Sequence, residues 1–259
     1  MRLLPWLAKI GFAAFAAALL IAIVAGFGSR LGFWNVYFGL FAIYPWSVGL
    51  ALIGFAFGLA WAVSAVIANR AASARYGAIG LLGSIALLAS PVQDMYGAMT
   101  SPRIHDISTA TDHPPEFVAL KSDRAGALTP PDYDGPKPAQ GPNGKSSTTT
   151  QLQKKYYPNI FSHADLTPPD TLFARALKTA YAMGWNVVDA NAKEGRIEAT
   201  DTTLLFGLTD DIVIRVKGAG MGARLDIRSK SRVPIWKDSD LGRNAAGVRS
   251  YLKTLSKTY

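Results

Sequence analysis

Cysteine is absent from this chain of 259 residues, and histidine occurs only three times. Without cysteine, the chain forms no disulfide, offers no thiolate to a metal and has no cysteine nucleophile. His105, His113 and His163 do not follow a known metal-ligand spacing, and the sequence contains no HExxH, GxSxG or glycine-rich phosphate loop. We therefore predict no cofactor and no catalytic residue, and we expect a protein that is not an enzyme.

Acidic residues are also absent from the first 93 positions, although basic residues are present there. The basic residues are Arg2, Lys9, Arg30, Arg70 and Arg75. Lysine and arginine beside apolar runs report membrane topology, so this share of the net charge of +9 does not indicate a nucleic-acid ligand. The remaining positive excess is thinly spread over the longer, polar part of the chain. We therefore predict no nucleic-acid partner.

Three apolar runs are predicted to cross a lipid bilayer, at about residues 10–28, 46–68 and 76–92. The first is longer than the apolar core of a signal peptide, so we expect an uncleaved anchor. The second run is predicted to begin after Pro45. This leaves the aromatic-rich stretch 33–44 as an interfacial, re-entrant or separately spanning segment. The third run lies at the short limit for a spanning helix.

The basic residues predict the orientation of these runs. They cluster before the first run and between the second and third, whereas only Arg30 separates the first from the second. The positive-inside rule then places the N-terminus in the cytoplasm and everything after the third run in the periplasm, as in a multi-pass protein of the inner membrane. No ionisable residue falls at mid-membrane depth, so the runs resemble a tether more than a transport pathway. Glycines such as Gly54, Gly58 and Gly80 predict close helix packing.

The rest of the chain divides by composition. Eleven of the 15 prolines lie between Pro102 and Pro169, and we predict a Pro-rich extended arm and linker over 94–157. Residues 158–259 are predicted to form a soluble α+β domain, an antiparallel four-stranded sheet with flanking helices in the order α-β-β-β-β-α. It would be attached to an all-α three-helix transmembrane anchor, residues 1–93. The predicted helices are 167–184 and 240–256, and the predicted strands are 185–190, 196–200, 212–217 and 225–229.

Several motifs in the polar part resemble one bacterial family. They are RIHDIST at 103–109, PPEF at 114–117, ATDT at 199–202, FGLTDDIVIR at 206–215, IRSKSR at 227–232 and DLGRN at 240–244. Together they are similar to the domain of unknown function 1499 family, in its membrane-anchored form, over roughly residues 102–255. The stretch PIWKDS at 234–239 departs from the shorter, glycine-containing turn of the family. The resemblance implies a fold and a location, and it implies no reaction.

Two groups of side chains are candidate sites. Arg228, Ser229, Lys230, Ser231 and Arg232 could bind an anion or a partner, helped by the N-terminus of the last helix. The alternative, which we favour, is ion pairing within the domain.

Carboxylates form the second candidate group, which contains Asp210, Asp211, Asp238 and Asp240. Hard cations need several converging carboxylates, so this group could hold a divalent metal. Pairing with arginines on neighbouring strands, and capping of the last helix by Asp238 or Ser239, is the interpretation we favour. Gly242 and Asn244 are candidates for a structural turn.

These patterns lead to one functional hypothesis with two alternatives. We expect a non-catalytic inner-membrane protein whose periplasmic domain binds an envelope partner, either a protein or an anionic lipid or polymer. The first alternative is a metal-dependent periplasmic enzyme built on the carboxylate cluster. The second is an accessory subunit of a transport complex, which would need a partner to supply intramembrane charge.

Overall fold

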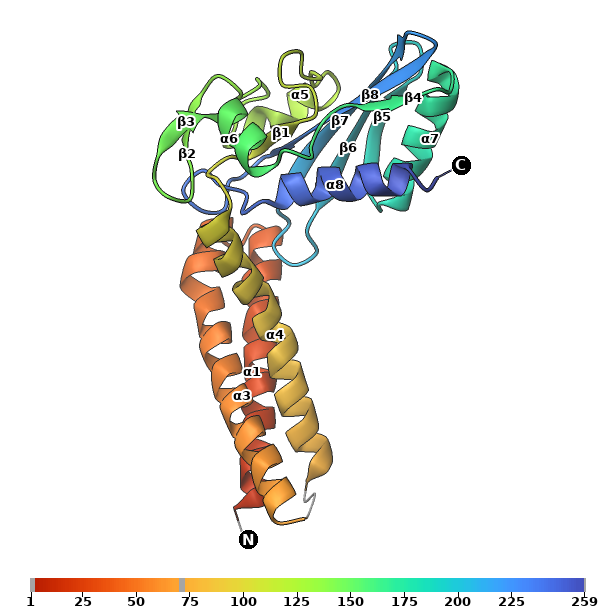
Figure 1. The fold of residues 1–259 in the computed structure, drawn as a ribbon. Coiled ribbons are helices and arrows are strands. Elements are labelled where there is room, and N and C mark those ends of the chain that lie inside the picture. Colours follow the sequence, from red (N-terminus) through yellow and green to blue (C-terminus); the bar gives the residue numbers. More distant parts are fainter. Residues whose placement is uncertain (1–2, 70–72, 259) are drawn as a thin grey trace. The chain divides into compact units, whose positions relative to one another are not determined.

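The computed structural model describes residues 3–69 and 73–258 (Figure 1). Arg2 and Arg70, two of the basic residues on which the predicted orientation depends, lie outside the described residues. The chain forms two compact units. The first comprises Met1–Tyr96 with Leu204–Gly207, and the second comprises Gly97–Thr203 with Leu208–Tyr259.

Three long apolar helices make up the first unit. They are α1 (Leu4–Arg30), a continuous helical run from Val36 to Ile67, and α4 (Ala74–Thr100). Each is long and apolar enough to cross a membrane, by length and composition, which agrees with the predicted number of spans. The third helix extends beyond the predicted run 76–92 at both ends and is as long as the first, with 27 residues each.

Pro45 does not divide the second run, contrary to the prediction. A short helix α2 (Val36–Phe38), a π-helical turn (Gly39–Ile43) and α3 (Tyr44–Ile67) follow one another without a break. A proline inside a helix lacks the N–H that would bond to the preceding turn, and its ring presses on the carbonyl there. The wider π-turn directly before Pro45 relieves this conflict. Most of the aromatic stretch 33–44 is therefore helical and continuous with α3.

Glycines let the three helices pack closely, as predicted. A Cβ atom at Gly54 of α3 would lie 2.4 Å from the Ser84 Oγ of α4 and 3.2 Å from the Gly11 carbonyl oxygen of α1. A Cβ atom at Gly80 of α4 would lie 2.8 Å from the Gly11 carbonyl carbon. Such distances are too short for a side chain, so the glycines at these contacts permit the observed backbone approach.

The second unit is built on one antiparallel sheet of six strands, with the order β1-β8-β7-β6-β5 and with β4 also paired to β8. The strands are β1 (Asp106–Ser108), β4 (His163–Asp165), β5 (Asn186–Asn191), β6 (Arg196–Thr202), β7 (Thr209–Ala219) and β8 (Gly222–Ser231). The predicted sheet of four strands is therefore wrong in number, although β5–β8 are the four predicted strands. The long β8 leaves backbone groups unpaired along its outer edge, and β1 and β4 satisfy them. Each added strand has three residues, too few for a recognisable alternation.

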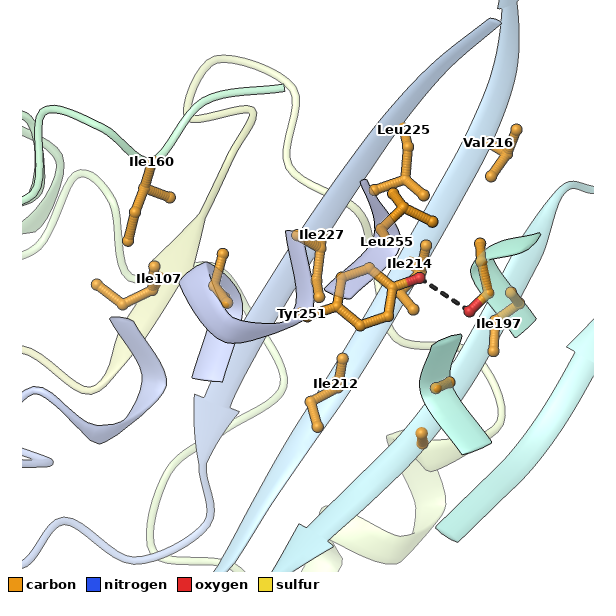
Figure 2. Close-up of a cluster of buried hydrophobic side chains, with 14 of the residues drawn as sticks. Ile107, Ile160, Ile197, Ile212, Ile214, Val216, Leu225, Ile227, Tyr251 and Leu255 are labelled. Carbon is orange, nitrogen blue, oxygen red and sulfur yellow. Dashed lines mark hydrogen bonds between the residues drawn. The ribbon is translucent and has the colours of Figure 1, made fainter. Parts of the chain in front are cut away.

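Two helices cover one face of this sheet and form the apolar core (Figure 1). They are α7 (Pro169–Ala182), which ends before Gly184 with φ +74°, and α8 (Arg243–Leu255). Isoleucines and leucines of β6–β8 point towards the ring of Tyr251, as Figure 2 shows. The Tyr251 hydroxyl donates a hydrogen bond to the Ala176 carbonyl at 2.9 Å. The Trp185 ring stacks on the Tyr251 ring with centroids 5.1 Å apart, so this side of the sheet is closed.

The segment 94–157, for which an extended arm is predicted, contains several short elements. After the end of α4 and β1 come α5 (Leu120–Asp123), β2 (Pro138–Gln140), β3 (Ser146–Thr148) and α6 (Thr149–Tyr156). A capping box between Thr148 and Gln151 begins α6. The buried carboxylate of Glu198 on β6 accepts backbone N–H bonds from residues 118–120 at 2.8–3.0 Å. The segment is thereby fixed to the sheet face opposite the helices.

Candidate functional site

Four of the five candidate residues lie on β8 and divide between the two faces of the sheet, and Arg232 follows directly after the strand. Because successive side chains of a strand alternate, Ser229 and Ser231 point to the helix side and Arg228 and Lys230 to the arm side. The structure therefore does not bring the five together as one surface. Each set has its own partners.

On the helix side, the two serines bond to the start of α8. The Ser229 hydroxyl donates to the Asn244 side-chain oxygen at 2.5 Å, and the Asn244 amide donates to the Ser231 hydroxyl at 2.9 Å. Asn244 is buried, and its backbone N–H donates to the carboxylate of Asp240 at 2.8 Å. Gly242 occupies the N-cap position with φ +84°, which a residue with a side chain rarely adopts. Gly242 thus ends the turn that joins the sheet to α8, and Asn244 lies in the first turn of that helix.

On the arm side, Arg228 and Lys230 are completely enclosed by the segment 106–134. The guanidinium of Arg228 donates to the Asp106 carboxylate through Nε and Nη2, both at 2.9 Å. Lys230 Nζ lies 2.8 Å from the Asp134 carboxylate and donates to the Asp132 carbonyl at 2.6 Å. Burial lowers the pKa of Lys230, while Asp106 and Asp134 oppose that shift. Neither cation is available to an external anion in this arrangement.

Aromatic rings complete the surroundings of Arg228. Its guanidinium carbon lies 4.8 Å from the Phe117 ring centroid and 5.3 Å from that of Tyr133. Burial raises the pKa of Tyr133 to about 12, so this ring stays neutral at physiological pH. Stacking of a guanidinium between aromatic rings stabilises it when it is removed from water.

The predicted carboxylate cluster is dispersed by the same alternation. Asp211 faces the arm, where Arg124 Nη1 lies 2.5 Å and Arg232 Nη2 2.8 Å from its oxygens. Asp210 faces α8, where Arg243 donates to both its oxygens at 2.8 Å.

The other two carboxylates lie in the loop before α8 and have different roles. Asp240 accepts the backbone N–H groups of Gly242 and Asn244 at 2.8 Å, and thus holds the first turn of the helix. Burial and the nearby Asp210 raise the pKa of Asp240. The side chain of Asp238 is exposed. Across residues 3–69 and 73–258, no group of three or more histidine or carboxylate side chains is placed to hold a metal ion.

His105 is a residue of this network that sequence reasoning left unassigned. Its Nδ1 lies 2.9 Å from the Asp238 carbonyl oxygen, and its Nε2 lies 3.1 Å from the Asp134 carboxylate. A neutral imidazole carries one N–H, whereas both partners here are acceptors. The ring therefore fits this site as the imidazolium. Burial by itself would lower the pKa of His105, but the two hydrogen bonds leave it raised. Only the tertiary fold supplies these partners, because Asp134 and Asp238 are distant in sequence.

A groove of about 570 Å³ lies beside this network, where β8, α6 and the loops at 109–113 and 158–162 meet. Its buried floor is formed by Thr109, Gln153 and Ile160. These floor groups are already engaged, since Gln153 exchanges hydrogen bonds with the Ser108 backbone and Thr109 with Ile227.

The rim of the groove carries groups that are less engaged. Lys154 Nζ lies 3.9 Å from the exposed Asp112 carboxylate, a loose pair, and Arg224 uses only its Nε in its pair with Asp226 among the described residues. The Phe161 ring is 66% exposed. His113 completes the rim. The groove therefore presents cationic donors and one aromatic face to solvent, and sequence patterns did not indicate it.

A known protein family matches most of the second unit. Residues 106–255 match the family described as "Protein of unknown function (DUF1499)". The chain belongs to the DUF1499 family. A search of curated proteins found no match.

The matched region of the DUF1499 domain contains the carboxylates and cations of the ion-pair network, and His105 lies one residue before it. It begins at Asp106, the partner of Arg228, and it includes Arg124 and Asp134. The DUF1499 domain is therefore the sheet together with the segment that covers its polar face. The predicted soluble boundary at residue 158 would leave the buried cations of β8 without their carboxylate partners.

The charged groups of the DUF1499 domain fall into two sets, one enclosed by the domain and one at the rim of the groove. The buried cations Arg124, Arg228 and Lys230 are paired with carboxylates, whereas the groove lining carries Lys154, Arg224 and the Ser162 hydroxyl, which donates to the Asp226 carboxylate at 2.5 Å.

Proposed function

We propose that this protein is a membrane-tethered, non-catalytic binding protein whose DUF1499 domain lies in the periplasm and holds an envelope component in the groove at 109–113, 153–162 and 224. One observation carries the proposal. The cations predicted to bind a partner, Arg228 and Lys230, are buried in internal ion pairs, whereas Lys154 and Arg224 on the groove rim keep donors directed to solvent.

The proposed periplasmic location is supported by the charge distribution and by three helices that are long and apolar enough to span a membrane. The absence of cysteine allows a direct test, because a single introduced cysteine is the only thiol in the chain. Lys193 lies exposed in the turn between β5 and β6, and Asn69 lies exposed in the loop between α3 and α4.

We expect Lys193→Cys to react with a membrane-impermeant maleimide in cells with a permeabilised outer membrane. Asn69→Cys should react only after the inner membrane is broken, because the loop that carries it is predicted to be cytoplasmic. The reverse labelling pattern would place the DUF1499 domain in the cytoplasm and end the proposal of an envelope partner.

Occupancy of the groove is tested by photo-crosslinking in intact cells. A benzoylphenylalanine replaces Phe161 on the groove rim or, as a matched control, Tyr181 on α7, because the two side chains are 66% and 61% exposed. We expect a discrete adduct from position 161 that weakens in the Lys154→Gln background, and no such adduct from position 181. The same adducts from both positions, or none from position 161, would contradict the proposal.

A further inference from the structure

We propose that the groove of the DUF1499 domain takes an acidic oligosaccharide, a glycan segment that carries carboxylate groups. This inference rests on the proposed binding function and names its ligand class. Three properties of the groove carry it, namely its size, its charged rim with an exposed aromatic ring, and the pairing of its backbone.

The size of the groove excludes a small inorganic anion as its natural occupant. At about 570 Å³ it falls within the range of about 300–1,000 Å³ that is usual for organic ligands. A single phosphate would contact only one end of such a groove. An occupant that reaches several rim groups must extend over more than one chemical unit.

The charge of the rim favours an anion. The cations Lys154 and Arg224 line the groove together with one carboxylate, that of Asp112, whose oxygen lies 3.9 Å from Lys154 Nζ. The Asp226 carboxylate holds the Arg224 Nε at 3.0 Å, which fixes the guanidinium stem. Cationic groups along a cleft raise the local concentration of anionic ligands.

The aromatic ring and the polar floor favour a sugar over a lipid. Phe161 offers an exposed flat face at the rim, against which the C–H face of a pyranose ring can pack. Thr109, Gln153 and Ser162 add polar atoms to a lining that also contains Pro158 and Ile160, so the groove is of mixed character and not a wholly apolar channel for an acyl chain. A hydroxylated ring with a carboxylate matches both the ring and the cations.

The backbone of the floor argues against an extended acidic peptide. Peptides bound in a groove of a β-domain commonly pair with a free strand edge. Here the Thr109 N–H donates to the Ile227 carbonyl at 2.9 Å. The edge of β8 beside the groove is likewise occupied by β4. The floor therefore presents no open strand edge to a peptide.

Binding to the full-length chain in zwitterionic lipid nanodiscs, measured by calorimetry, tests this inference. The probes are an oligogalacturonate, a neutral maltooligosaccharide of equal length, oligoglutamate and inorganic phosphate. We expect the oligogalacturonate to bind at least about tenfold more tightly than the other three, because it alone offers both carboxylates and sugar rings. Equal binding of oligoglutamate or phosphate would show a general anion patch and overturn the inference, as would no binding of the oligogalacturonate.

Two pairs of variants locate the binding. Lys154→Gln should weaken oligogalacturonate binding by roughly threefold to tenfold, while Lys155→Gln, the same charge change on the next residue, should leave it unchanged because Lys155 does not line the groove. Phe161→Leu keeps an apolar side chain but removes the aromatic face, and it should weaken binding in high salt as well as in low salt. An equal effect of the two lysine variants, or no effect of Phe161→Leu, would refute the assignment.

Failure here is distinguishable from failure of the proposed function. If the groove crosslinks to another envelope component in cells but does not bind oligogalacturonate, the proposed binding function stands and the glycan assignment is wrong. A groove without any adduct at position 161 would reject the binding function itself.

Discussion

Raising the pH should destabilise the DUF1499 domain through His105, and the sign follows from its hydrogen bonds. Both ring nitrogens face acceptors, the Asp238 carbonyl at 2.9 Å and the Asp134 carboxylate at 3.1 Å. The pKa of His105 is raised in the folded domain. A group whose folded pKa is raised contributes stability below its unfolded pKa of about 6.5, and that contribution is lost as the pH rises through the folded pKa.

The magnitude follows from the bond that a neutral ring gives up. With one N–H for two acceptors, the ring loses one hydrogen bond, and a bond to a charged group is worth about 1.5–3 kcal/mol. Asp134 keeps its contacts to Lys137 and Lys230, and the His105 side chain is 16% exposed, so water relieves part of the loss. We therefore expect a loss around or just below the lower end of that range, about 1–2 kcal/mol, which corresponds to a factor of about 5–30 in the folding equilibrium.

Hydrogen exchange of the β7–β8 hairpin in the full-length chain measures this change, because its slowest amides report opening of the whole domain. After correction for intrinsic exchange rates, protection should fall between about pH 6 and about pH 8.5, on either side of the unfolded pKa. His105→Gln, which keeps one donor and does not titrate, should remove this fall. His113→Gln should retain it, since the His113 ring makes no hydrogen bond or ion pair within the described residues. An unchanged pH dependence in His105→Gln, or protection that rises with pH in the wild type, would refute the reasoning.

Three further substitutions test the buried network and the packing. Asp211→Asn should cost about 3–5 kcal/mol in chemical unfolding because it leaves two arginines with a weaker partner in a buried site. By contrast, the exposed Asp238→Asn should stay within about 0.5 kcal/mol. Tyr251→Phe should cost about 0.5–1.5 kcal/mol in the same assay, through the lost bond to the Ala176 carbonyl. Gly80→Leu should lower the thermal stability of the helix bundle in detergent by about 1–3 kcal/mol, because a side chain there meets the backbone of α1.

The main elements of the DUF1499 domain were predictable from periodicity. Alternation of Ile212, Ile214 and Val216 with other residues marks β7, and the glycine after α7 marks the end of that helix. β1 and β4 could not be found this way, since three residues carry no period and their pairing depends on the free edge of β8. The continuous helix through Pro45 was also missed, because the π-turn that tolerates the proline has no simple sequence signature.

The candidate site shows the same division. The motif IRSKSR correctly drew attention to β8, and the rule of alternation separates its cations from its serines. Residues far away in the sequence decide whether such cations face solvent. Arg228 pairs with Asp106 and Arg124 pairs with Asp211, and the two partners of each pair are separated by about a hundred residues along the chain. A run of basic residues therefore indicates that carboxylate partners are needed if the cations are buried, and it does not identify those carboxylates.

The sequence by itself determined the apolar helices, the four strands β5–β8 and the absence of thiol chemistry, because each depends on local composition or a short repeat. The tertiary structure decided which charges are enclosed and which remain on the surface. It brought Asp134 and Asp238 to the two nitrogens of His105, and it placed Lys154 and Phe161 on one groove rim. Electrostatic pairing and burial act between residues that are close in space, and local patterns carry no record of that proximity.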